Sequence, residues 1–293
     1  MARPGLDPVP EWDAPGFDEL VKAIVAARRQ DRPVIWSMGA HVIKNGMSRY
    51  IIELARRGIV THIAGNGASS IHDFELAFLG ATSEDVAASI EDGSFGMWEE
   101  TGRGMNEAIR EGARRGLGYG ASLAEYALAR ADRFPHLQDC VFAEAFRLGI
   151  PYTCHISIGT DIIHQHPAVD FAALGLASGI DFEGFCRSVL ALGGGVFLNF
   201  GSAVSGPLLL GRALAVAHNT GHPVRGFTAA HFDIRPLRVA DPEAAAPPAP
   251  GDAILVRLPR LLGGAGYAVC GLHQVTIPNL YARILARWGR DNG

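Results

Sequence analysis

The sequence predicts an α/β protein with three layers: a mostly parallel, doubly wound sheet covered by helices on both faces. Three observations support this fold class. Short apolar runs alternate with helical stretches, these stretches are long enough to cross over between parallel strands, and the 293 residues are 48% hydrophobic. A chain of this composition buries a large core, and strands separated by helices form βαβ crossovers.

The elements follow from this alternation. The expected strands are short apolar runs, many of them rich in β-branched or aromatic residues. In chain order they are Pro33–Ser37, Ile59–Ala64, Ile150–Ile156, Gly195–Phe200, Arg225–Ala230 and a further run, AILVRL, at Ala253–Leu258. The expected helices are Phe17–Arg29, Ser48–Arg57, Met105–Arg115, Leu123–Arg130, Leu137–Arg147, Leu208–His218 and Ile277–Trp288.

The organisation indicates a single domain over residues 1–293, because no internal repeat and no second-domain boundary stand out. Residues Asp241–Asp252, DPEAAAPPAPGD, are rich in proline and alanine without a period. Such a segment is typical of an exposed loop.

Charge and cysteine usage exclude some classes of protein. The net charge of −4 and the lack of a Lys/Arg cluster argue against nucleic-acid binding. The cysteines Cys140, Cys154, Cys186 and Cys270 form no CxxC pair, which is typical of a reducing, cytoplasmic environment. No apolar run reaches the ~18 residues that suggest a membrane span, so we expect no membrane partner.

In a parallel sheet, ligands bind beyond the carboxyl ends of the strands, so the loop after each strand is the place to look for chemistry. The first such loop is SMGAHVIKNG, Ser37–Gly46. Its glycines, histidine and lysine before a helix suit an anionic group, because helix N-termini present free N–H donors. An ordinary tight turn explains the same pattern.

The second loop reads GNGASS and leads to His72, Asp73 and Glu75 at or just past the start of a helix. Glycines here allow backbone amides to approach a ligand closely. Three ionisable residues within four positions favour function. Asp73 or a serine capping the helix is the alternative.

The third loop, GTDIIHQHP, contains Asp161, His164 and His166. Two histidines at i and i+2 can bind a metal from an extended segment, with the aspartate as a third ligand. Pro167 interrupts the local chain, so these side chains need not converge, and a metal is the less favoured interpretation.

The later loops supply further candidates. The glycines Gly193–Gly195 lead into the fourth strand, and Asn199, Ser202 and Ser205 follow. His231 and Asp233 come after the fifth strand. Small polar side chains here either hydrogen-bond a ligand or begin a helix.

Taken together, the segments SMGAHVIKNG, NGASSIHDFE, IPYTCHISIGTD, LGGGV, FTAAHFD and IPNLY resemble the deoxyhypusine synthase family in order and spacing, over roughly Pro33–Leu280. The resemblance implies a single domain with a Rossmann-like NAD-binding fold, and a homotetramer with active sites at subunit interfaces. It also implies a reaction in which NAD oxidises a polyamine and a lysine imine carries the aminoalkyl group.

The resemblance implies an NAD site at matching positions of several loops. These positions are Ala40, His41, Val42, Gly46, Asn66, Gly67, Ala68, Asp161, Gly193, Gly194, Gly195, Thr228 and Ala229. Asp161 is the expected ribose ligand, because a carboxylate accepts two hydroxyl hydrogen bonds and discourages a 2′-phosphate.

The polyamine chemistry does not carry over. Leu198 and Asn199 stand where the family has a lysine–histidine pair, and the tryptophan–glycine–lysine motif that bears the imine-forming lysine has no counterpart. His166 stands where an amine-binding carboxylate is expected. Lys44 is the only lysine near the expected cleft. Deoxyhypusine synthesis itself is therefore not expected.

The leading hypothesis is an NAD-dependent oxidoreductase or transferase acting on a small polar or amine-bearing molecule. Its candidate catalytic residues are His72, Asp73, His164, His166, His231 and Lys44, since histidine titrates near neutrality and lysine forms imines. One alternative is a metal-dependent hydrolase or lyase whose metal ligands are drawn from His72, Asp73, His164, His166 and His231. Another is a non-catalytic protein that binds NAD or a metabolite.

Overall fold

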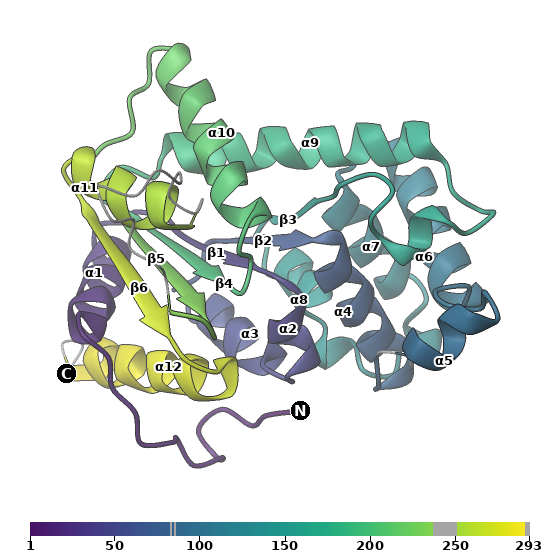
Figure 1. The fold of residues 1–293 in the computed structure, drawn as a ribbon, viewed down its shortest axis with the longest axis horizontal. Helices are drawn as coiled ribbons and strands as arrows, with labels where there is room; N and C mark the ends of the chain where they lie inside the picture. Colours follow the sequence, from purple (N-terminus) through teal and green to yellow (C-terminus); the bar gives the residue numbers. More distant parts are fainter. Residues whose placement is uncertain (83, 85, 237–250, 291–293) are drawn as a thin grey trace. The chain divides into compact units, whose positions relative to one another are not determined.

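The computed structural model describes residues 1–82, 84, 86–236 and 251–290 (Figure 1). Its contacts divide the chain into two compact units, Met1–Ile63 with Phe185–Gly293, and Ala64–Gly184. No helix of the described residues is both long and apolar enough to cross a membrane. The expectation of a single domain stays a prediction.

The α/β fold class is confirmed. The strands are β1 (Val34–Met38), β2 (His62–Asn66), β3 (Tyr152–His155), β4 (Val196–Phe200), β5 (Thr228–Asp233) and β6 (Ala265–Cys270). They form one six-stranded sheet in the order β3-β2-β1-β4-β5-β6. The pairs β1–β4, β4–β5 and β5–β6 are parallel, with Ser37 opposite Asn199 and Asn199 opposite His231.

The helices of the first unit cover both faces of its strands. They are α1 (Phe17–Arg29), α2 (Ala40–Lys44), α3 (Ser48–Arg56), α10 (Ser205–Asn219), a π-helix (Gly251–Arg257), α11 (Leu258–Leu261) and α12 (His273–Arg290). Helices α1 and α12 lie on the face opposite α10 (Figure 1). The rings of Trp36, Phe200 and Phe232 stack beneath α1, where Phe17 meets Phe232 edge-on.

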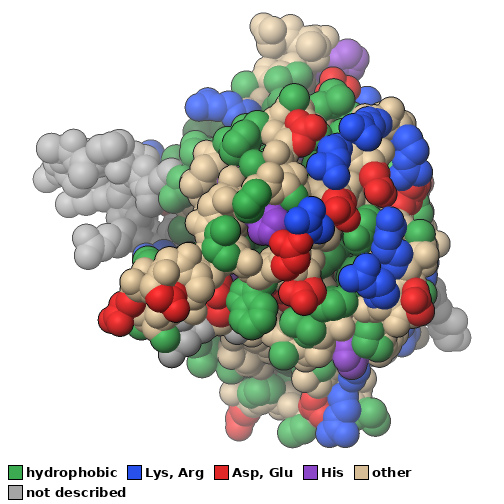
Figure 2. Space-filling model, turned by 90° about the vertical axis from the view of Figure 1, so that its right-hand side faces the viewer, with side chains coloured by type: hydrophobic (Ala, Val, Ile, Leu, Met, Phe, Trp, Pro, Cys, Tyr) green, Lys and Arg blue, Asp and Glu red, His purple; other side chains and the backbone are tan. Residues whose placement is uncertain are grey.

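The second unit is mainly helical. It contains α4 (Gly67–Leu79), α5 (Val86–Glu91), α6 (Glu99–Ala113), α7 (Tyr119–Leu128) and α8 (Val141–Arg147), with short 3₁₀ turns at Ala131–Arg133, Leu137–Asp139 and Ile162–His164. Helix α9 (Phe171–Leu190) begins in this unit and ends in the first. On the face seen in Figure 2, basic and acidic side chains are interspersed instead of gathered into single-sign patches.

The apolar run AILVRL is not a strand, so that prediction is wrong. It lies in the π-helix and the start of α11, and the last strand is β6, after Gly263 and Gly264. A short buried apolar run suits a strand and a buried helix equally well. Residues 241–250 of the expected loop lie outside the described part, whereas Gly251 and Asp252 are buried and begin the π-helix.

Two predicted strand boundaries shift, and the helix after β2 starts earlier along the chain than His72. Strand β2 begins at His62 instead of Ile59, and β5 begins at Thr228 instead of Arg225. Helix α4 begins at Gly67, directly after β2. These differences change which side chains lie at the carboxyl ends of the strands and which lie within a strand or helix.

Candidate functional site

The turn from β2 into α4 is the best-formed ligand cradle of the second unit. Asn66 caps the helix, its side-chain oxygen accepting from the Ser69 amide at 2.8 Å. The amides of Gly67 and Ala68 have no acceptor among the described residues. Free amides at the start of a 13-residue helix favour an electron-rich ligand group.

Asp161 lies against this turn. A Cβ atom on Gly67 would overlap the Asp161 carboxylate, so a larger residue there would displace this side chain. The Asp161 side chain is 10% exposed, and its Oδ2 atom is buried without a hydrogen-bond partner among the described residues. Burial raises the pKa of Asp161 to about 6. A buried acceptor without a partner costs free energy and marks a position where a donor from a ligand is expected.

His164 is held beside Asp161 by its own backbone. Its Nδ1 atom accepts from the amides of Gly159 at 3.1 Å and Asp161 at 3.2 Å, which assigns the proton to Nε2. Nε2 is buried without a hydrogen-bond partner and lies 3.8 Å from Asp161 Oδ2. Burial lowers the pKa of His164. The pair therefore presents one acceptor and one donor side by side.

His166 does not join this pair. Its Nδ1 atom accepts from the Ala168 amide, and its Nε2 atom lies 3.1 Å from Glu99 Oε2 on α6. The ring packs against Gly102, where a Cβ atom would overlap it. Both nitrogens have partners, so the geometry gives His166 a role in fixing the loop to α6.

The residues His72, Asp73 and Glu75 lie one to two turns inside α4, because the helix starts five residues before His72. The His72 ring contacts Thr82 at 2.6 Å, and the Thr82 hydroxyl donates to Glu75. These residues lie past the start of the helix, and His72 and Glu75 face Thr82 in the segment that follows it.

Asp73 has partners of its own. Its two carboxylate oxygens accept from the amides of Val141 at 3.1 Å and Phe142 at 3.0 Å, at the start of α8. The side chain is fully buried, which raises its pKa to about 6. Asp73 therefore holds the N-terminus of α8.

In the first unit, the loop after β1 forms α2, which contains Ala40, His41, Val42 and, as its last residue, Lys44. Val42 is buried, whereas His41 and Lys44 are exposed. Gly46 follows with φ of 73°, a conformation that favours glycine.

A buried polar row crosses the sheet of the first unit under the start of α10. The Ser37 hydroxyl donates to Asn199 Oδ1 at 3.2 Å, and Asn199 Nδ2 donates to the Ser202 carbonyl and to His231 Nδ1, both at 2.8 Å. His231 Nε2 lies 3.9 Å from Asp233 Oδ2. Burial lowers the pKa of His231, while Asp233 opposes that effect. Gly206 of α10 fits directly over Asn199.

At the other end of these strands, where β4 and β5 begin, lie Gly193–Gly195 and Thr228–Ala229. Gly193–Gly195 precede β4, and the Thr228 amide donates to the Gly195 carbonyl at the start of β5. The loop after β1 lies at the other ends of these parallel strands, roughly five residues or ~16 Å away. The structure thus does not bring these glycines together with Ala40–Val42.

The sequence reading missed His273, the first residue of α12. It is 3% exposed, and its Nδ1 atom is buried without a hydrogen-bond partner among the described residues. No sequence signal was available, because β6, whose carboxyl end precedes His273, was not among the predicted strands.

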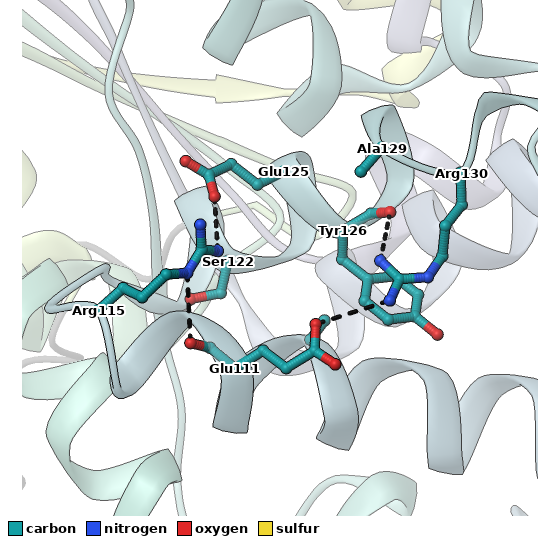
Figure 3. Close-up of a pocket in the computed structure, with 8 residues that line it drawn as sticks. Glu111, Arg115, Ser122, Glu125, Tyr126, Ala129 and Arg130 are labelled. Atoms are coloured by element: carbon teal, nitrogen blue, oxygen red, sulfur yellow. Dashed lines mark hydrogen bonds and ion pairs between the residues drawn. The ribbon is translucent and has the colours of Figure 1, made fainter.

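A separate pocket of about 210 Å³ lies between α6 and α7. Arg115 contacts Glu125 at 2.6 Å, and Arg130 contacts Glu111 at 3.6 Å while its guanidinium lies over the Tyr126 ring (Figure 3). These charged groups are paired with one another across the two helices.

The described residues contain no group of three or more histidine, cysteine, aspartate or glutamate side chains placed to hold a metal ion. Within the second unit, His72, Asp73, His164 and His166 each face different neighbours: Thr82, the start of α8, Asp161 and Glu99. The set from which the metal alternative was built is therefore dispersed.

No family model and no curated protein matches the sequence. Solved structures match by fold. One is the ternary complex of AgrE with ornithine and NAD+, at a TM-score of 0.55 and 16% identity, covering 94% of this chain and 33% of that chain. The chain thus spans about a third of AgrE.

Two other structures share the fold over most of their length. A conserved protein of Methanococcus maripaludis S2 assigned as LOR/SDH matches at a TM-score of 0.56 and 13% identity, covering 99% of this chain and 74% of that chain. A protein of Entamoeba histolytica assigned as a deoxyhypusine synthase matches at 0.50 and 9%, covering 92% and 87%. These identities show a shared fold alone, so the family resemblance stays a prediction.

Proposed function

We propose that this protein is an NAD-dependent enzyme acting on a small polar molecule, with a ribose of the cofactor bound where Asp161 faces the turn between β2 and α4. The observation that carries the proposal is the buried Asp161 carboxylate, whose Oδ2 atom has no partner among the described residues and lies against the Cα atom of Gly67. Two neighbouring ribose hydroxyls are the donors that such a carboxylate accepts.

The residues around Asp161 fit this ligand. The free amides of Gly67 and Ala68 favour electron-rich atoms, and His164 Nε2–H offers a further donor. A buried carboxylate repels a 2′-phosphate, so NAD is favoured over NADP. When bound, NAD supplies a hydride acceptor. The AgrE complex, which contains NAD+ on a related fold, is consistent with this choice.

Substituting Gly67 with alanine tests the cradle. The added methyl group would overlap the Asp161 carboxylate and displace it, so we expect NAD affinity to fall at least about 30-fold. Isothermal titration calorimetry with NAD and NADP measures this effect. The matched control is Gly175→Ala on α9, where a Cβ atom meets nothing within 4 Å and affinity should not change.

Undetectable NAD binding by the unmodified protein would contradict the proposal. Equal NAD affinity in Gly67→Ala and the unmodified protein would remove the β2–α4 turn from the site. NAD binding without turnover of any polar substrate would favour the non-catalytic alternative. The homotetramer expected from the resemblance is part of the same proposal, and light scattering after gel filtration tests it.

A further inference from the structure

The first turn of α12 has the properties of an anion site. The amides of Leu272, His273 and Gln274 have no acceptor among the described residues, and the helix continues for 18 residues. The free amides of a long helix carry a partial positive charge at its N-terminus. A helix start alone does not make a site, so a second observation is needed.

His273 supplies that observation. His273 is 97% buried, and its Nδ1 atom has no hydrogen-bond partner in the described part of the chain. No described residue forms a hydrogen bond with its Nε2 atom. The ring meets Phe200 edge-on, and a Cβ atom on Gly201 would lie 2.7 Å from Nε2. Leaving the buried Nδ1 atom of an imidazole without a hydrogen bond is unfavourable unless a ligand completes it.

We propose that the first turn of α12, with His273 and Arg235, binds the carboxylate or phosphate group of a small-molecule ligand. This inference goes beyond the NAD proposal, since every residue in it belongs to the first compact unit and the proposed ribose ligand belongs to the second.

The carboxylate nearest His273 is already paired with Arg235. His41, His231 and Asp233 interact electrostatically with His273, and burial lowers the pKa of His273 to about 4. Asp233 Oδ1 accepts from the Arg235 amide at 2.9 Å and from its Nε at 3.3 Å, so this carboxylate is already compensated. An amine substrate would find no uncompensated carboxylate in this group.

The surroundings also indicate an apolar part of the ligand. Arg235 has a side chain that is 73% exposed, so its terminal nitrogens are accessible. Val204, Ile234 and Leu272 are exposed and lie in the loops that follow β4, β5 and β6. Neighbouring strands are ~4.8 Å apart, which places these apolar residues around the same edge.

The experiment is a titration of the full-length protein with inorganic phosphate, followed by nuclear magnetic resonance of the histidine side chains. We expect phosphate to raise the pKa of His273, because a bound anion stabilises the charged imidazole. The His273→Gln variant assigns the resonance. Arg235→Ala should weaken phosphate binding about tenfold, and Arg212→Ala on the exposed side of α10 should not change it.

Two arms identify the source of the anionic group. Displacement of phosphate by ADP-ribose assigns the site to a dinucleotide pyrophosphate, and displacement by lactate or succinate, but not by ADP-ribose, assigns it to an acidic substrate. Either result supports the anion site. Equal phosphate affinity in the unmodified protein, His273→Gln and Arg235→Ala overturns it. Loss of NAD binding in Asp161→Asn with phosphate binding retained separates this site from the proposed ribose site.

Discussion

Replacing Asp161 with asparagine is expected to weaken NAD binding about 100-fold while stabilising the ligand-free protein. Loss of the charge weakens two hydroxyl hydrogen bonds, which together contribute roughly 3 kcal/mol. The same change replaces a buried, charged oxygen that has no partner among the described residues by a neutral amide nitrogen, and burying a neutral group costs less than burying a charge. Asparagine still accepts the capping bond from the His164 amide. Calorimetry with NAD and thermal unfolding without ligand measure the two effects.

The pH dependence of stability separates this explanation from a general loss of structure. Burial raises the pKa of Asp161 from 3.8 to about 6, so between these values the folded state keeps a proton that the unfolded chain releases. The stability gained from that proton is complete below about pH 4 and is lost as the pH rises to about 6. Asp161→Asn should therefore be more stable than the unmodified protein above pH 6, by up to about 3 kcal/mol.

NAD binding should show the opposite trend. Ribose hydroxyls bind the ionised carboxylate better than the neutral one, so affinity should fall as the pH drops below about 6. Asp73 and Asp181 also have raised pKa values, so the comparison uses the difference between variant and unmodified protein at each pH. Asp132→Asn, an exposed change in the same unit, is the control. Unchanged NAD affinity in Asp161→Asn would contradict the assignment.

Replacing Asp73 with alanine is expected to lower the free energy of unfolding by about 4 kcal/mol. This change in stability is larger than the one expected for Asp161→Asn. The substitution removes the acceptor of two buried amides at the start of α8, and each orphaned donor costs about 1–3 kcal/mol. Urea denaturation followed by circular dichroism measures the change.

Asp73→Asn distinguishes a structural role from a catalytic one. Asparagine keeps one acceptor oxygen, so stability should lie between those of the alanine variant and the unmodified protein. Turnover per folded molecule should be unaffected, since both carboxylate oxygens already bind backbone amides. A large loss of turnover in a stably folded Asp73→Asn protein would restore the catalytic interpretation.

The sequence predicted β1 to β5 because these strands are almost wholly buried and therefore appear as compact apolar runs, as VIWSM and VFLNF do. Strand β6 is only partly buried and was not predicted. The residues at which the strands begin were harder to predict. The three-residue shift of β5 places Thr228 at the amino end of the strand and His231 within it. Helix α9 was not predicted, because its glycines and apolar residues give a weak helical period.

The candidate site was predictable only in part. Asp161 and Gly67 were both identified as candidates. No sequence pattern shows that the Asp161 carboxylate lies against the Cα atom of Gly67. The roles of Asp73 and His166 depend on amides and a glutamate distant in sequence, namely Val141, Phe142 and Glu99. Such pairings arise from tertiary convergence, which local spacing does not encode.

The ring of hydrogen bonds around His164 and His166 has a kinetic consequence. Asn106 Nδ2 donates to the Ile163 carbonyl at 2.9 Å, and the two histidines hold backbone amides on either side of it. The loop that carries Asp161 is therefore ordered before any ligand arrives. Little conformational entropy remains to be lost on binding, so association at this carboxylate should proceed in a single fast phase, without a slow folding step of the loop.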